Sequence, residues 1–192
     1  MKADSGDKVK TAGEVLESNL DVGAHSPSES GKAAEVLPVF QLKRILVPVD
    51  FSKCSLKALQ YAIPFARQFG AELTLLHVIS PAVVLQTSEL APQGISEATA
   101  AAKEGLEELR KTVGPEIASR SLVRNGSPHI AIIDAAKELD IDLIILSTHG
   151  STGLRHVLLG STVEKVVRRA GCPVLIVREH EHEFIYVADF SC

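Results

Sequence analysis

Two short apolar runs near the C-terminal end constrain this chain most strongly. The first, Leu143 to Leu146, is apolar at every position, which is typical of a strand covered on both faces of a parallel sheet. The second, Pro173 to Val177, has the same character. A glycine-containing loop and a stretch with helical spacing of apolar residues lie between them. The segment therefore predicts a strand, a loop, a helix and a second strand.

The same alternation is found further upstream. Apolar runs predict strands over 45–49 and 73–78, and a weaker third strand is predicted over 118–124. Helices are predicted to begin at Ser52 and Ser127, each a good N-cap residue, and to extend from Ser96 to Val113. Five strands that alternate with helices make an α/β fold, an open five-stranded parallel sheet with helices on both faces. In such sheets ligands bind at the carboxyl ends of the strands.

The loop before the last helix has the properties of an anion site. Ser161 is predicted as the N-cap, and Glu164 three positions later completes a capping box. The first amides of a helix have no partner within it, and they carry partial positive charge. Gly150, Gly153 and Gly160 allow the backbone to approach a phosphate closely. The alternative is that these glycines only make a tight connection.

The spacing in this loop is more specific than its composition. Ser147-x-x-Gly150, nine further residues and then Gly160-Ser161 resemble the signature of nucleotide-binding universal stress proteins, which is Gly-x-x-Gly, nine residues and Gly-Ser or Gly-Thr. Ser147 departs from the first glycine, and a positive φ would be unfavourable there. The resemblance extends from about 42 to 178. No Walker motif and no Gly-x-Gly-x-x-Gly run occurs.

The resemblance implies a Rossmann-like sheet of the adenine nucleotide alpha hydrolase-like type, with the first and fourth strands adjacent. It implies ATP, or ADP or AMP, as the ligand, with or without Mg²⁺. Asp50 would accept hydrogen bonds from ribose or hold the metal of a Mg-nucleotide, and the alternative is a carboxylate that caps the next turn. The predicted binding residues are Pro48, Val49, Asp50, Val78, Ser147, Thr148, Gly150, Thr152, Gly153, Gly160, Ser161 and Thr162.

Composition limits the other function classes. The net charge of −4 and the few aromatic residues argue against nucleic acid as a partner. No segment has the length of a membrane span or the core of a signal peptide, and three scattered cysteines fit a reducing compartment, so we expect a cytoplasmic protein. We expect a flexible arm over 1–40, the universal stress protein α/β domain over 41–179 and a tail over 180–192.

Three functions remain open at this stage. The first is an ATP-binding stress or signalling module, and the second is a dimeric interaction protein that binds no nucleotide. The third is a slow ATPase, for which no general base or activated nucleophile is identified, so we predict no catalytic residues. The family resemblance also implies a homodimer formed through the edge strand at Val174 to Val177.

Overall fold

The computed structural model describes residues 41–81, 91–148 and 159–178, and its core is one five-stranded sheet. The spatial order of the strands is β3-β2-β1-β4-β5, and every neighbouring pair is parallel. The predicted α/β fold and the predicted adjacency of the first and fourth strands are therefore confirmed. The strands are β1 (Arg44–Pro48), β2 (Glu72–Ile79), β3 (Ser119–Asn125), β4 (Leu143–Ser147) and β5 (Val174–Val177).

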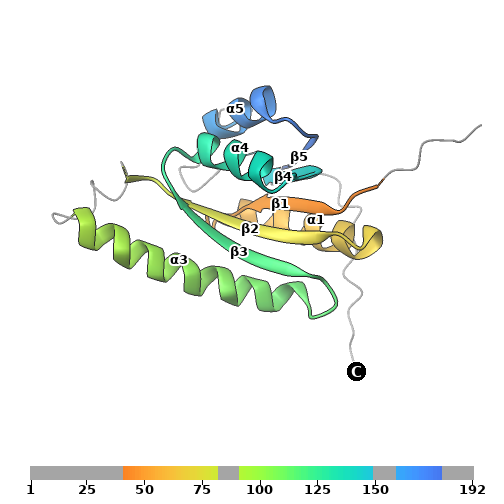
Figure 1. Cartoon of the computed structure of the whole chain (residues 1–192), viewed down its shortest axis with the longest axis horizontal. Helices are drawn as coiled ribbons and strands as arrows, with labels where there is room; N and C mark the ends of the chain where they lie inside the picture. The colour runs from red at the N-terminus through yellow and green to blue at the C-terminus, as the bar shows by residue number, and fades with distance from the viewer. Residues whose placement is uncertain (1–40, 82–90, 149–158, 179–192) are drawn as a thin grey trace, which may run out of the picture. The chain divides into compact units, whose positions relative to one another are not determined.

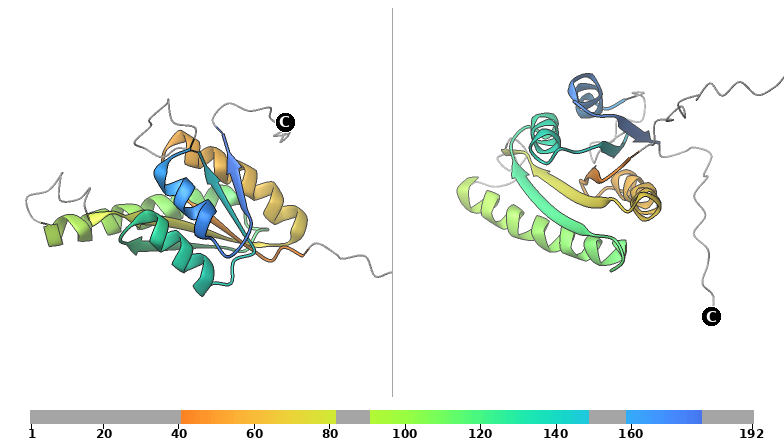
Figure 2. Two further views of the ribbon diagram at one scale, coloured as in Figure 1. Left: turned by 90° about the horizontal axis from the view of Figure 1, so that it is seen from above. Right: turned by 45° about the vertical axis from the view of Figure 1, so that its right-hand side comes forward.

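Helices cover both faces of this sheet. One face packs against α1 (Lys53–Phe69) and α3 (Ala91–Val113), and the other against α4 (Pro128–Glu138) and α5 (Ser161–Arg169) (Figures 1 and 2). Ile144 and Ile145 are adjacent on β4 and both fully buried, yet they belong to different core clusters, one on each face. This arrangement explains why β4 is apolar at consecutive positions, since each side chain has a core of its own. Burial of each such side chain stabilises the fold by about 1.5–3 kcal/mol.

The ends of α1 follow the predicted capping chemistry. The Ser52 hydroxyl oxygen accepts a hydrogen bond from the Ser55 N–H at 3.2 Å, and Gly70 ends the helix with a left-handed φ of 65°. On α4, Ile132 and Ala136 are buried at the i and i+4 spacing of an inward-facing row, whereas Lys137 is exposed.

Two helix starts differ from the prediction. α3 begins at Ala91 rather than Ser96, because Pro92 lies in the first turn, where a missing N–H removes no hydrogen bond. α5 has Gly160 as its N-cap, so the prediction of a capping box at Ser161 is wrong. Ser161 is the first helical residue and is exposed, and the Glu164 carboxylate binds Arg168 at 3.1 Å instead of reaching back to the cap.

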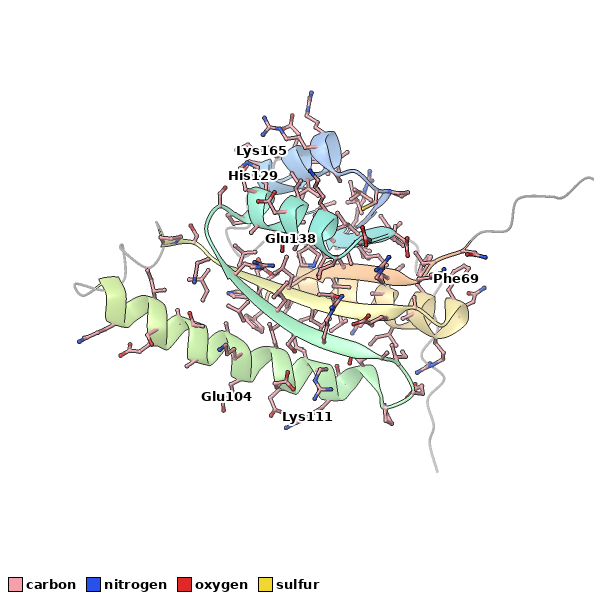
Figure 3. All side chains as sticks on the ribbon, viewed as in Figure 1. Phe69, Glu104, Lys111, His129, Glu138 and Lys165 are labelled. Carbon is pink, nitrogen blue, oxygen red and sulfur yellow. The ribbon has the colours of Figure 1, made fainter. Side chains whose placement is uncertain are left out.

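The outer surfaces of the helices carry charged residues together with a few exposed apolar ones, namely Phe69, Ile130 and Val167. On α3, Glu104 and Lys111 extend away from the sheet (Figure 3). Within the ranges described, no helix combines the length and the apolar character needed to cross a membrane. Within the described part of the chain, neither Cys54 nor Cys172 takes part in a disulfide bond. The predicted arm (1–40), the predicted tail (180–192) and Cys192 lie outside the described residues.

Candidate functional site

The carboxyl ends of β1 and β4 form the candidate site. The two strands pair in parallel, with Leu46 opposite Ile144, so the residues that follow each strand emerge side by side. After β1 these residues are Val49 and Asp50; at β4 they are Ser147, the last residue of the strand, and Thr148, which follows it. The sheet therefore brings together two of the predicted binding segments at the end where ligands bind in this class of fold.

Backbone hydrogen bonds attach the start of α5 to the same place. The Gly160 N–H donates to the Thr148 carbonyl oxygen at 2.9 Å, and the Thr148 N–H donates to the Val177 carbonyl oxygen at 3.1 Å. The end of β4, the end of β5 and the front of α5 are thus joined through one residue, Thr148. The amides of the first turn of α5 are consequently held at the carboxyl end of β4.

Gly160 leaves the front of α5 without a capping side chain. Its backbone is extended, with φ −64° and ψ 150°, and its carbonyl oxygen accepts the Glu164 N–H at 3.0 Å. A helix of this kind offers its first N–H groups and the positive end of its dipole to an anion. Ser161 is exposed and Thr162 is half-buried, so both hydroxyl groups belong to the same surface.

Ser147 occupies the position where the family signature has glycine. It is the last residue of β4, and only 7% of its surface is exposed, while Thr148 is 4% exposed. Among the described non-glycine residues, a positive φ occurs at Phe51 and Asp140 and not at Ser147. A serine therefore fits this backbone without strain, and the departure from the signature does not disturb the strand end.

Asp50 caps the turn that follows β1. Its Oδ1 accepts a hydrogen bond from the Ser52 N–H at 3.1 Å and one from the Ser52 hydroxyl at 2.6 Å. The capping alternative raised by the sequence is thus confirmed, while contacts to ribose or to a metal stay predictions. A carboxylate accepts several hydrogen bonds at once, so the cap and a ligand contact are compatible. The described part of the chain contains no cluster of three or more His, Cys, Asp or Glu side chains that could hold a metal.

The remaining predicted residues fall into two groups. Val78 is half-buried near the end of β2 and packs against the core on the α4 and α5 face. Pro48 ends β1 and is half-buried. Gly150, Thr152 and Gly153 lie outside the described residues, so their predicted role stays a prediction.

The sequence reasoning missed the residues that support the β1–α1 turn. The His77 Nδ1 lies 2.8 Å from the Val49 carbonyl oxygen, and because a carbonyl oxygen only accepts, Nδ1 carries the proton and donates. The Phe51 ring lies 4.8 Å from the His77 ring, centroid to centroid. The one available signal was a histidine near the end of an otherwise largely apolar strand.

These two rings also border a cavity on the α3 side of the sheet. It measures about 300 Å³, and its other lining residues are small ones on α3, namely Ala98, Ala101, Ala102 and Gly105. Phe51 and His77 therefore connect the turn after β1 to α3, whereas α5 approaches the strand ends from the opposite face.

Known proteins with the same features identify the family. The model of the universal stress protein family matches residues 41–178. Universal stress protein MJ0531 of Methanocaldococcus jannaschii is 35% identical over 146 residues, which cover 73% of this chain and 85% of that protein. The solved structure of MJ0577 from the same organism is 30% identical, with a TM-score of 0.68 over 74% of this chain and 100% of the other.

A second solved structure, of a universal stress protein in complex with cAMP, is 25% identical. Its TM-score is 0.55, and the match covers 72% of this chain and 98% of that one. The family match over residues 41–178 spans all five strands of the sheet and the strand-end site described above. The chain belongs to the universal stress protein family.

Proposed function

We propose that this protein binds an adenine nucleotide at the carboxyl ends of β1 and β4 and serves as a nucleotide-responsive module in a stress or signalling response. The observation that carries the proposal is the junction at Gly160. There an uncapped helix start is fixed to the end of β4 by the hydrogen bond from the Gly160 N–H to the Thr148 carbonyl oxygen. Such a junction presents several N–H groups to one phosphate.

The roles of the other predicted residues follow from their chemistry and from the family resemblance. Asp50 would accept hydrogen bonds from the ribose hydroxyls, and Val78 would contact the base. The hydroxyl groups of Ser161 and Thr162 would add donors beside the phosphates. Mg²⁺ bound with the nucleotide would neutralise phosphate charge, and the Asp50 carboxylate is a suitable oxygen ligand for it. ATP, ADP and AMP share all of these contacts except the outer phosphates.

Two further observations bear on the ligand and on assembly. The relative solved with cAMP, which has the same fold, supports an adenine nucleotide as the ligand class. The strand β5 lies at the edge of the sheet, and its residues Val174, Leu175 and Ile176 are only half-buried. An apolar edge strand of this kind favours pairing with a second copy, so we propose a homodimer through β5.

Isothermal titration of the full chain with ATP, ADP, AMP and cAMP tests the proposal. Valine at position 160 is compatible with the observed φ and ψ, so Gly160→Val should fold while its side chain blocks the phosphate. Gly171→Val is the matched control, because a Cβ at Gly171 meets no atom within 4 Å. We expect Gly160→Val to lose at least tenfold in affinity, as the loss of a charge-assisted contact implies, and Gly171→Val to bind like the unmodified protein.

Two outcomes would favour the other candidate functions. Wild-type protein that gives no heat with any of the four nucleotides, and carries none through gentle purification, would favour an interaction protein without a ligand. Steady release of phosphate from labelled ATP with Mg²⁺, absent in Gly160→Val, would favour a slow ATPase. Light scattering after size-exclusion chromatography measures the dimer separately, so the two parts of the proposal are tested independently.

A further inference from the structure

The turn between β1 and α1 has an unusual backbone. Phe51 follows Asp50 directly and has a φ of 62°, in the left-handed region that bulky residues rarely adopt. Backbone of this kind persists only where the surrounding structure holds it, and it is frequent at ligand sites. The contacts that hold Phe51 therefore also determine where Asp50 lies.

His77 provides one set of these contacts from the neighbouring strand. Its Nδ1–H donates to the Val49 carbonyl oxygen at 2.8 Å, immediately before Asp50. Its ring also lies against the Phe51 ring, immediately after Asp50, with an interplanar angle of 34°. A single side chain on β2 thus contacts both neighbours of Asp50.

Two other residues, Ser55 on α1 and Gly105 on α3, also lie against this turn. Ser55 is 3% exposed, and its hydroxyl oxygen accepts the Asp50 N–H at 3.3 Å. On α3, a Cβ placed on Gly105 would lie 2.9 Å from the Phe51 ring, so the helix backbone already approaches that ring closely. Phe51, which is 39% exposed, therefore packs between α3 and His77 on its inner side.

We propose that His77 is a positioning residue for the nucleotide site, acting through the Val49 carbonyl to fix the carboxylate of Asp50. This inference rests on the proposed function, because it assigns a role in nucleotide affinity to a residue behind the site. The hydrogen bond to Val49 carries the effect, and the ring contact with Phe51 is secondary. His77 itself does not contact the nucleotide.

Two substitutions separate the hydrogen bond from the ring. His77→Phe keeps a ring against Phe51 and loses the donor. His77→Asn loses the ring but keeps an N–H donor attached at the same carbon as Nδ1. The control is Thr112→Val, which removes a hydrogen bond from a side chain to the Leu109 carbonyl oxygen near the end of α3.

We expect His77→Phe to weaken ATP binding about tenfold in isothermal titration, which corresponds to about 1.4 kcal/mol. His77→Asn should stay within about threefold of the unmodified protein, because it restores the hydrogen bond. Thr112→Val should bind normally. Equal affinity for His77→Phe and wild type would overturn the proposal, as would equal weakening in both His77 variants, which is the result for a merely structural residue.

Amide hydrogen exchange without nucleotide keeps this test separate from the proposed function. His77→Phe should speed exchange at Asp50 and Ser52, whose N–H groups are hydrogen-bonded in this turn, at least tenfold, as the loss of one hydrogen bond implies, and His77→Asn should not. If wild-type protein binds no nucleotide, the proposed function fails, and with it the assignment of His77 to nucleotide affinity, whatever the exchange shows. If wild type binds but exchange in the turn is unaltered in His77→Phe, the positioning role alone is refuted.

Discussion

Replacing Asp142 with alanine should lower the free energy of unfolding by about 2–3 kcal/mol. Asp142 directly precedes β4, and its Oδ2 accepts hydrogen bonds from the backbone N–H groups of Lys43 and Arg44, both at 2.8 Å. This carboxylate therefore ties the start of β1 to the start of β4. Hydrogen bonds to a charged group contribute about 1.5–3 kcal/mol each. The hydrogen bond to the Lys43 N–H is exposed, and water can replace it. The expected loss of unfolding free energy is therefore smaller than the sum of the two hydrogen-bond contributions.

Asp142→Asn provides the matched control for charge. An amide oxygen can still accept from the same N–H groups, so we expect this variant to lose roughly 1 kcal/mol. Urea unfolding followed by circular dichroism measures both variants, and the slope with denaturant should stay unchanged. Nucleotide affinity should also be unaffected, because Asp142 lies at the opposite end of the strands from the candidate site. The reasoning is refuted if Asp142→Ala unfolds within about 0.5 kcal/mol of wild type, the ordinary range for surface substitutions.

Three further outcomes are expected. Leu106→Ala removes a fully buried side chain and should cost about 2–5 kcal/mol in urea unfolding. Burial, followed by positive charges on α5 that include Lys165 (Figure 3), lowers the pKa of His129. The unfolded chain then binds more protons, so stability should fall as the pH drops below about 6.5, less steeply in His129→Gln. Burial, and then the charge of Asp142, raises the pKa of the Cys172 thiol. Cys172 should therefore react with a disulfide reagent at pH 8 more slowly than a small-molecule thiol does. In Asp142→Asn the same cysteine should react faster than it does in the unmodified protein.

The strands were predictable because burial on two faces leaves a direct mark on the sequence. Ile144 and Ile145 face different clusters, and a run of consecutive apolar residues indicates that situation without any knowledge of the partners. The Ser52 cap and the Gly70 stop were equally local, since each depends on neighbours within a few residues.

The rest depended on contacts between segments distant in sequence. Ser161 followed the rules for an N-cap, but the cap is Gly160, whose carbonyl oxygen accepts the Glu164 N–H and whose own N–H donates to the distant Thr148. The bond from His77 to Val49 requires the register of β1 against β2, in which Pro48 lies opposite Leu76. That register is a property of the assembled sheet, and no local pattern encodes it.

The bond between Gly160 and Thr148 also has a consequence for how the family can diversify. The Gly160 N–H and the Thr148 carbonyl oxygen lie 2.9 Å apart, so the two ends of the intervening segment are held together whatever its sequence. Each doubling of such a segment costs only about 0.6 kcal/mol in chain entropy. Residues there can accordingly be exchanged while the sheet stays as it is, with the nine-residue spacing from Gly150 to Gly160 kept as the signature has it. An engineer who wishes to change ligand preference would graft new sequence between these two anchors.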